Sequence, residues 1–141
     1  MRNLQRIGVA LVLLAAVSAV GLASPAAADL EKTPQAKAFR AQMKAIAAGD
    51  YEAYKKVTPA DTLKQMDSQL KQMGKTSKDG MDLMKMMSPS DIVITAVKVE
   101  GKKATLSATG KSDGTAMKGT VEMAEEDGQW KGGKQSWSNA K

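Results

Sequence analysis

The hydrophobic pattern of this chain changes its period near residue 90, and this change limits the possible folds more than any other feature of the sequence. Before residue 90, apolar residues recur at intervals of three and four, which places them on one face of a helix. After it, apolar and polar residues alternate, as on a strand that is buried on one face. Helices followed by strands predict an α+β domain with helices packed on one face of an antiparallel sheet.

The first predicted helix lies in TPQAKAFRAQMKAIAAGD, where Thr33 is placed to cap it and Pro34 suits its first position. Its apolar residues recur at intervals of three, four and three, and Gly49 is placed to end it. Asp50 is placed to cap a short second helix, YEAYKKV.

A third helix is predicted in TPADTLKQMDSQLKQMG, where Thr58 takes the cap position and Pro59 the first helical position. Gly74 is expected to end this helix. The segment KTSKDG then reads as a polar loop, because Asp79 precedes a glycine as it would in a turn.

Four strands are predicted after residue 90, and short turns between them imply an antiparallel meander. Gly132 and Gly133 within the last strand predict a bulge. We expect the helical part over about residues 33–88 and the sheet over about residues 91–138. The predicted turns contain Gly101-Lys102, Asp113-Gly114 and Asp127-Gly128.

Residues 1–28 have the composition of a signal peptide. Arg2 and Arg6 precede the apolar run IGVALVLLAAVSAVGLA, and the small residues that end at Ala28 suit a cleavage site. Cleavage there leaves one α+β domain of residues 29–141 with no stable membrane span, in the periplasm or secreted. An uncleaved anchor helix is the alternative.

The charge of the remaining chain argues against nucleic-acid binding. Removing residues 1–28 lowers the formal net charge from +6 to +4, and lysines scattered among fifteen acids supply nearly all the positive charge. Nucleic-acid sites instead gather basic residues and aromatic rings on one face. The chain has no cysteine and no histidine, so thiol chemistry is excluded and an enzyme is not expected. No cofactor is expected either.

Four methionines, Met81, Met84, Met86 and Met87, lie in the short segment MDLMKMM. In a helix their apolar arc, with Leu83, spans about 220°, which is wider than a helix resting on one sheet face requires. The segment is therefore expected to be buried on two sides or to present methionine to a ligand or partner. Core filler, a pocket wall or partner groove, and a thioether copper(I) site of Met81, Met84 and Met87 all remain open.

Several short motifs in the chain together resemble the NTF2-like superfamily. They are AIAAGDYEAYKKVTP, VKVEGKKATLSATG and VEMAEEDGQWK, and the likeness is to the small exported domains of the DUF4878 and lumazine-binding-like kind. It spans about residues 36–137. The resemblance implies a curved antiparallel sheet wrapped on helices into an NTF2-like or cystatin-like cone, with an apolar pocket at its mouth and Trp130 on the last strands.

The leading functional hypothesis is a non-catalytic exported module that holds a small apolar ligand or an envelope protein partner at a methionine-lined concave face. A copper(I)-handling periplasmic protein and an inhibitor or immunity-type protein are the alternatives. A homodimer is a further expectation from the resemblance. The candidate ligand-binding residues are Met81, Met84, Met87, Tyr51, Tyr54 and Trp130.

Overall fold

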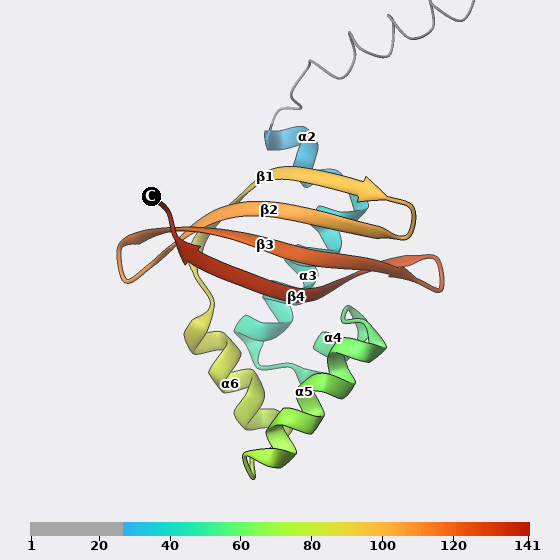
Figure 1. The fold of residues 1–141 in the computed structure, drawn as a ribbon, viewed down its shortest axis with the longest axis vertical. Coiled ribbons are helices and arrows are strands. Elements are labelled where there is room, and N and C mark those ends of the chain that lie inside the picture. Colours follow the sequence, from blue (N-terminus) through green and yellow to red (C-terminus); the bar gives the residue numbers. More distant parts are fainter. Residues whose placement is uncertain (1–26) are drawn as a thin grey trace, which may run out of the picture.

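The computed structural model describes residues 27–141, and in these residues all helices precede the strands (Figure 1). The predicted signal peptide, residues 1–28, lies outside the described residues except for its last two. The helices are α2 (Ala27–Glu31), α3 (Pro34–Ala48), α4 (Tyr51–Lys56), α5 (Ala60–Gln72) and α6 (Ser77–Met87). The strands are β1 (Ser90–Glu100), β2 (Lys103–Ser112), β3 (Thr115–Glu126) and β4 (Gln129–Asn139).

The four strands form one antiparallel sheet in the order β1-β2-β3-β4, which confirms the predicted α+β class and the meander. The turns lie where the sequence predicts them. Gly101, Asp113 and Asp127 adopt positive φ angles of 62°, 48° and 52° in these turns. Glycine and aspartate tolerate this left-handed conformation better than most residues do, which explains their use here.

The predicted bulge in β4 is also present. The pairing of β3 with β4 moves from Val121 opposite Gln135 to Met123 opposite Gly132, so β4 carries one residue more than β3 in this interval. A Cβ atom on Gly132 would lie only 2.4 Å from Oε1 of Gln42. The bulge therefore combines with a glycine to let α3 approach the backbone of β4 closely.

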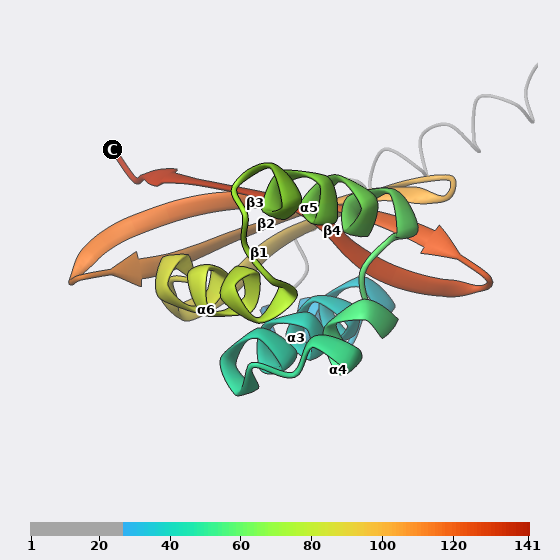
Figure 2. The ribbon, with the colours of Figure 1, turned by 90° about the horizontal axis from the view of Figure 1, so that it is seen from below.

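Helices α3 and α2 pack on the sheet, while α4, α5 and α6 extend beyond it. Figure 1 shows α3 behind the strands and α4, α5 and α6 beyond the β4 edge, and Figure 2 shows the same helices from below. Helix α3 packs against the sheet, α2 packs against β1, and α4, α5 and α6 pack mainly on α3 and on one another. Within residues 27–141, no helix is both long and apolar enough to cross a membrane.

The core is divided into two hydrophobic clusters that share α3. Phe39 of α3 is fully buried in the sheet cluster, whereas Ile46, two turns further along α3, is buried in the helical cluster. The sheet cluster contains Leu30, Ala36, Phe39, Ile94, Ala104, Leu106, Ala108, Val121 and Met123. The helical cluster contains Ala45, Ile46, Tyr54 and Met81.

Buried polar side chains join α3 to the bulge of β4. Nε2 of Gln42 donates to the carbonyl of Gly132 at 2.6 Å and to Oγ1 of Thr58 at 3.1 Å. Oγ1 of Thr58 donates to the carbonyl of Tyr54 at 2.7 Å, and Nε2 of Gln135 donates to Oε1 of Gln42 at 3.2 Å. The buried side chains of Gln42 and Thr58 thus each have hydrogen-bond partners, which burial requires if they are not to destabilise the fold.

The prediction that Thr58 caps α5 was wrong. Helix α5 begins at Ala60 after Pro59, and no side chain of the preceding residues caps it. The carboxylate of Glu126 on β3 accepts the backbone N–H of Ala60 at 3.3 Å instead. Thr58 is occupied in the buried network, so a residue distant in sequence stabilises the first turn of α5.

The predicted polar loop at residues 75–80 was wrong in part, because α6 already begins at Ser77. Oγ1 of Thr76 accepts from the backbone N–H of Asp79 at 3.3 Å. The carboxylate of Asp79 accepts from the backbone N–H of Thr76 at 2.8 Å, which completes a capping box. Asp79 therefore starts a helix and does not form the predicted turn.

Candidate binding surface on helix α6

The methionines of α6 divide into a buried pair and an exposed pair. Met81 is only 1% exposed and lies in the helical cluster, and Met84 is half-buried against the same cluster. Met86 and Met87 are 83% and 72% exposed, and Leu83 is 43% exposed. We call the surface formed by Leu83, Met86 and Met87 the α6 methionine face.

The division follows from how closely α6 packs on its neighbours. Gly80 and Met81 are buried on α6, and a Cβ atom on Gly80 would lie 2.8 Å from Cδ1 of Leu70. The close approach fixes the side of α6 that turns inward, and Met84 lies on that same side because it is three residues after Met81. The over-wide apolar arc is therefore not buried on two sides within the described residues.

Two of the predicted candidates, Tyr51 and Tyr54, serve the helical cluster. Their rings stack with centroids 6.5 Å apart, and Tyr54 is 5% exposed. Burial raises the pKa of the Tyr54 hydroxyl. The hydroxyl of Tyr51 donates to Oδ1 of Asp67 at 3.2 Å, and Nζ of Lys55 lies 5.2 Å from the Tyr51 ring centroid. The tyrosine pair thus packs and orients α4 within the domain.

The candidate residues do not form one site. Met81, Met84, Tyr51 and Tyr54 share the helical cluster, whereas Trp130 packs against the sheet cluster and Met87 lies on the exposed side of α6. The three thioether sulfurs proposed for copper(I) therefore belong to side chains in different environments: Met81 is buried, Met84 is half-buried and Met87 is exposed. Among the described residues, no group of three acidic, cysteine or histidine side chains could hold a metal ion.

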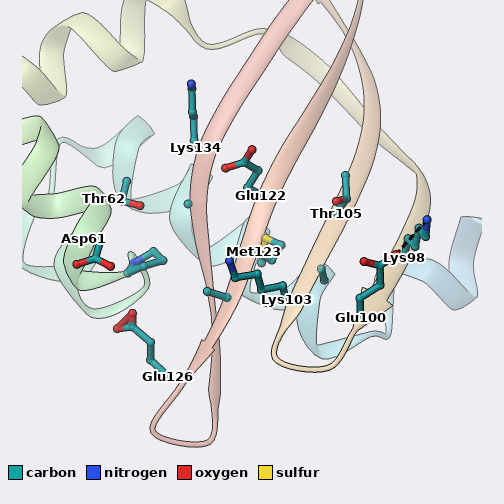
Figure 3. Close-up of a pocket in the computed structure, with 14 residues that line it drawn as sticks. Asp61, Thr62, Lys98, Glu100, Lys103, Thr105, Glu122, Met123, Glu126 and Lys134 are labelled. Carbon is teal, nitrogen blue, oxygen red and sulfur yellow. Dashed lines mark ion pairs between the residues drawn. The ribbon is translucent and has the colours of Figure 1, made fainter.

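A polar recess of about 650 Å³ lies on the sheet face opposite α3, beside the start of α5 (Figure 3). Nζ of Lys98 and Oε1 of Glu100 are 3.1 Å apart at its edge. Glu126 stabilises the start of α5 and lies 3.7 Å from Nζ of Lys131. Its side chains carry both charges in nearly equal number, namely Asp61, Glu100, Glu122 and Glu126 against Lys98, Lys103 and Lys134.

A second cavity of about 360 Å³, which we call the α3–β1 cleft, lies between α3, the end of α6 and the start of β1. Its apolar lining includes Met43, Ile46 and Ile92, and its polar lining includes Arg40 and Lys85. Sequence reasoning missed this cleft, because its walls come from segments about forty residues apart and no single motif joins them. The helical spacing of Met43 and Ile46 predicts only that both lie on the apolar face of their helix.

No protein-family model matches this chain, and no curated protein matches its sequence. The likeness to the NTF2-like superfamily stays a prediction from the motifs that suggested it.

Proposed function

We propose that the protein is a non-catalytic exported interaction module that binds an apolar segment of an envelope protein through the α6 methionine face. The observation that carries this proposal is the exposure of Leu83, Met86 and Met87 on one helix. Exposed apolar clusters of this kind are characteristic of interaction sites. Methionine suits such a site because its flexible, polarisable side chain adapts to partners of different shape.

The shape of the surface favours a protein over a small molecule as the partner. Leu83, Met86 and Met87 project from the outside of a helix, and none of them lines the polar recess beside α5 or the α3–β1 cleft. A convex apolar surface buries little of a small ligand but can pack against the apolar side of a helix or an extended segment. Inhibition of a partner enzyme would be one form of this function.

The charges around the α6 methionine face indicate an association driven by apolar burial. The exposed charged residues of α6 are two lysines and two aspartates, namely Lys78, Lys85, Asp79 and Asp82. Because these charges balance, they add little long-range attraction for a partner of either sign. We therefore expect the affinity for the partner to change little between low and high salt.

Site-specific photocrosslinking in the host tests the proposal. A photoreactive amino acid at Met86 should capture one discrete protein. The same amino acid at Thr120, which is exposed on the sheet face opposite α3, should not. The captured protein, once purified, should bind the unmodified chain and lose binding when Met86 and Met87 become serine. Met73→Ser, which removes another exposed methionine, is the matched control and should leave binding unchanged.

Three outcomes would contradict the proposal. Equal capture from positions 86 and 120 would show that crosslinking follows exposure alone. Capture of a second copy of this chain would make the surface a homodimer contact. Unchanged partner affinity of the Met86→Ser and Met87→Ser double variant would show that binding uses another surface. Because both methionines are exposed, the double variant should keep the stability of the unmodified chain.

A further inference from the structure

We propose that Met86 and Met87 form a reversible oxidation site, at which a two-electron oxidant of the peroxide class converts their thioethers to sulfoxides and releases the partner protein. The inference rests on the proposed function, because it concerns how the α6 methionine face loses its partner. It adds a modification site and its chemistry, and both can be measured without the partner.

The most reactive groups that the chain offers to such an oxidant are thioethers. The chain contains no cysteine, so methionine sulfur is its softest nucleophile. An oxidant reacts only with a sulfur atom that it can reach, and Met86 and Met87 are 83% and 72% exposed. The next most exposed methionine of the described chain is Met73, at 54%. The two methionines of the α6 methionine face are therefore the first to meet the oxidant.

The methionines that hold the fold together are shielded from the oxidant. Met81 is 1% exposed in the helical cluster, and Met123 is 2% exposed in the sheet cluster. Oxidation of these two would place a polar sulfoxide in the core and destabilise the protein. Because exposure separates the two sets so widely, Met86 and Met87 can be oxidised while the domain stays folded.

The two reactive sulfurs belong to one apolar surface. Leu83 is three residues before Met86 and four before Met87, so its side chain is a neighbour of both on the helix. Water hydrates the polar S–O bond of a sulfoxide on the free protein, but an apolar partner would bury that bond without a hydrogen bond. We therefore expect oxidation of both methionines to weaken partner binding by at least about tenfold.

The chemical step is an oxygen transfer to sulfur. A lone pair of the thioether sulfur attacks one oxygen of hydrogen peroxide, so that an S–O bond forms and the O–O bond breaks. The leaving hydroxide takes the proton from the transferred oxygen, and the products are methionine sulfoxide and water. Sulfur loses two electrons and the peroxide gains them. Methionine sulfoxide reductases reverse the change with two thiols as the reductant, which become a disulfide while the oxygen leaves as water.

The experiment is a stepwise titration of the folded, processed chain with hydrogen peroxide. Peptide mass spectrometry measures the oxidation of each methionine, and urea denaturation measures the stability. Retention on a phenyl resin measures the apolarity of the surface without a partner, and the protein captured from position 86 is used to measure affinity. We expect Met86 and Met87 to be oxidised before Met81 and Met123, with retention and affinity falling together and stability unchanged. Methionine sulfoxide reductase should restore both retention and affinity.

Leucine variants separate this site from general oxidative damage. The Met86→Leu and Met87→Leu double variant keeps the volume and the apolar character of the surface. It should bind the captured protein before peroxide treatment and equally well after it. Met73→Leu, which removes another exposed sulfur and keeps the two reactive ones, is the matched control. It should lose binding on oxidation as the unmodified chain does.

Three results would overturn the inference. They are oxidation of Met81 or Met123 as early as that of Met86 and Met87, unchanged retention and affinity of the chain that carries both sulfoxides, and an equal loss of binding in the leucine double variant. Failure of the proposed function gives a different result, namely equal affinity of the untreated Met86→Ser and Met87→Ser double variant and the unmodified chain for the captured protein. That result would overturn partner release, whereas the peptide mapping and the retention decide on the oxidation site by themselves.

Discussion

At the scale of single residues, Gln42 has the most demanding environment in the described chain. It is 1% exposed and uses both ends of its amide to join α3 to Thr58, in the loop between α4 and α5, and to the bulge of β4. A glutamine on a helix predicts solvent exposure when its sequence is considered alone. Its burial depends on Gly132, whose missing side chain leaves space for the amide.

We expect Gln42→Ala to lower the free energy of unfolding by about 1–3 kcal/mol, because it removes the amide donor to the carbonyl of Gly132 and the oxygen acceptor of the Gln135 amide. Urea denaturation followed by tryptophan fluorescence measures the change. Gln69→Ala, an exposed glutamine in α5, is the matched control. Equal effects of the two substitutions would show that the buried network does not contribute.

Glu31 and Arg40 should make stability depend on pH. The hydrogen bond from the Arg40 guanidinium lowers the pKa of Glu31 below its ordinary value of 4.5. The unfolded chain therefore binds the proton more readily, so the stabilisation is complete well above pH 4.5 and is lost as the pH falls below it. Since both side chains are 39% exposed, we expect this ion pair to contribute less than about 1 kcal/mol to the free energy of unfolding.

Urea denaturation of the unmodified chain and of Glu31→Gln between about pH 6 and pH 3 tests this expectation. The variant should lose less stability on acidification than the unmodified chain. Arg40→Gln should have the same effect, and the double variant should add nothing further. A steeper loss of stability in Glu31→Gln would contradict the assignment.

At the scale of elements, the helices differ in what starts them. Helices α3, α4 and α6 are each capped by the side chain of the residue just before the helix, namely Thr33, Asp50 and Thr76. The first two could be predicted because the cap is a local contact. The start of α5 could not, because Glu126 reaches it from β3 through the tertiary fold.

Thr76→Ala should fray the first turn of α6 and destabilise the protein by about 1 kcal/mol, because it removes one half of the capping box. Urea denaturation followed by far-UV circular dichroism measures the change. Ser68→Ala, an exposed hydroxyl inside α5, is the control and should cost nothing, since alanine is the better helix former. A loss of stability in Ser68→Ala as large as that in Thr76→Ala would contradict the capping role.

At the scale of the whole molecule, α3 makes the two hydrophobic clusters cooperate. Phe39 lies in the sheet cluster, Ile46 in the helical cluster, and Met43 packs against both. Because α3 packs in both clusters, unfolding of one cluster would remove contacts that hold α3 in place for the other. We therefore expect the helices and the sheet to unfold together in one transition.

Phe39→Ala and Met81→Ala test this cooperativity from the two clusters, and each should cost about 2–5 kcal/mol. Both tryptophans, Trp130 and Trp137, lie on β4, so their fluorescence reports the sheet, whereas far-UV circular dichroism follows the helices as well. The two signals should change at the same urea concentration in both variants. A circular dichroism transition that precedes fluorescence in Met81→Ala would show that the outer helices unfold alone.

The sequence by itself determined the order of helices and strands, three turns, the bulge and the caps of α3 and α4, because hydrophobic period, turn residues and capping residues act over a few positions. Only the tertiary structure decided that α3 covers the sheet, that Glu126 starts α5, and which methionines of α6 face solvent. Those outcomes depend on contacts between residues distant in sequence. The contact between Gly80 and Leu70 sets the rotation of α6, and the α6 methionine face follows from it.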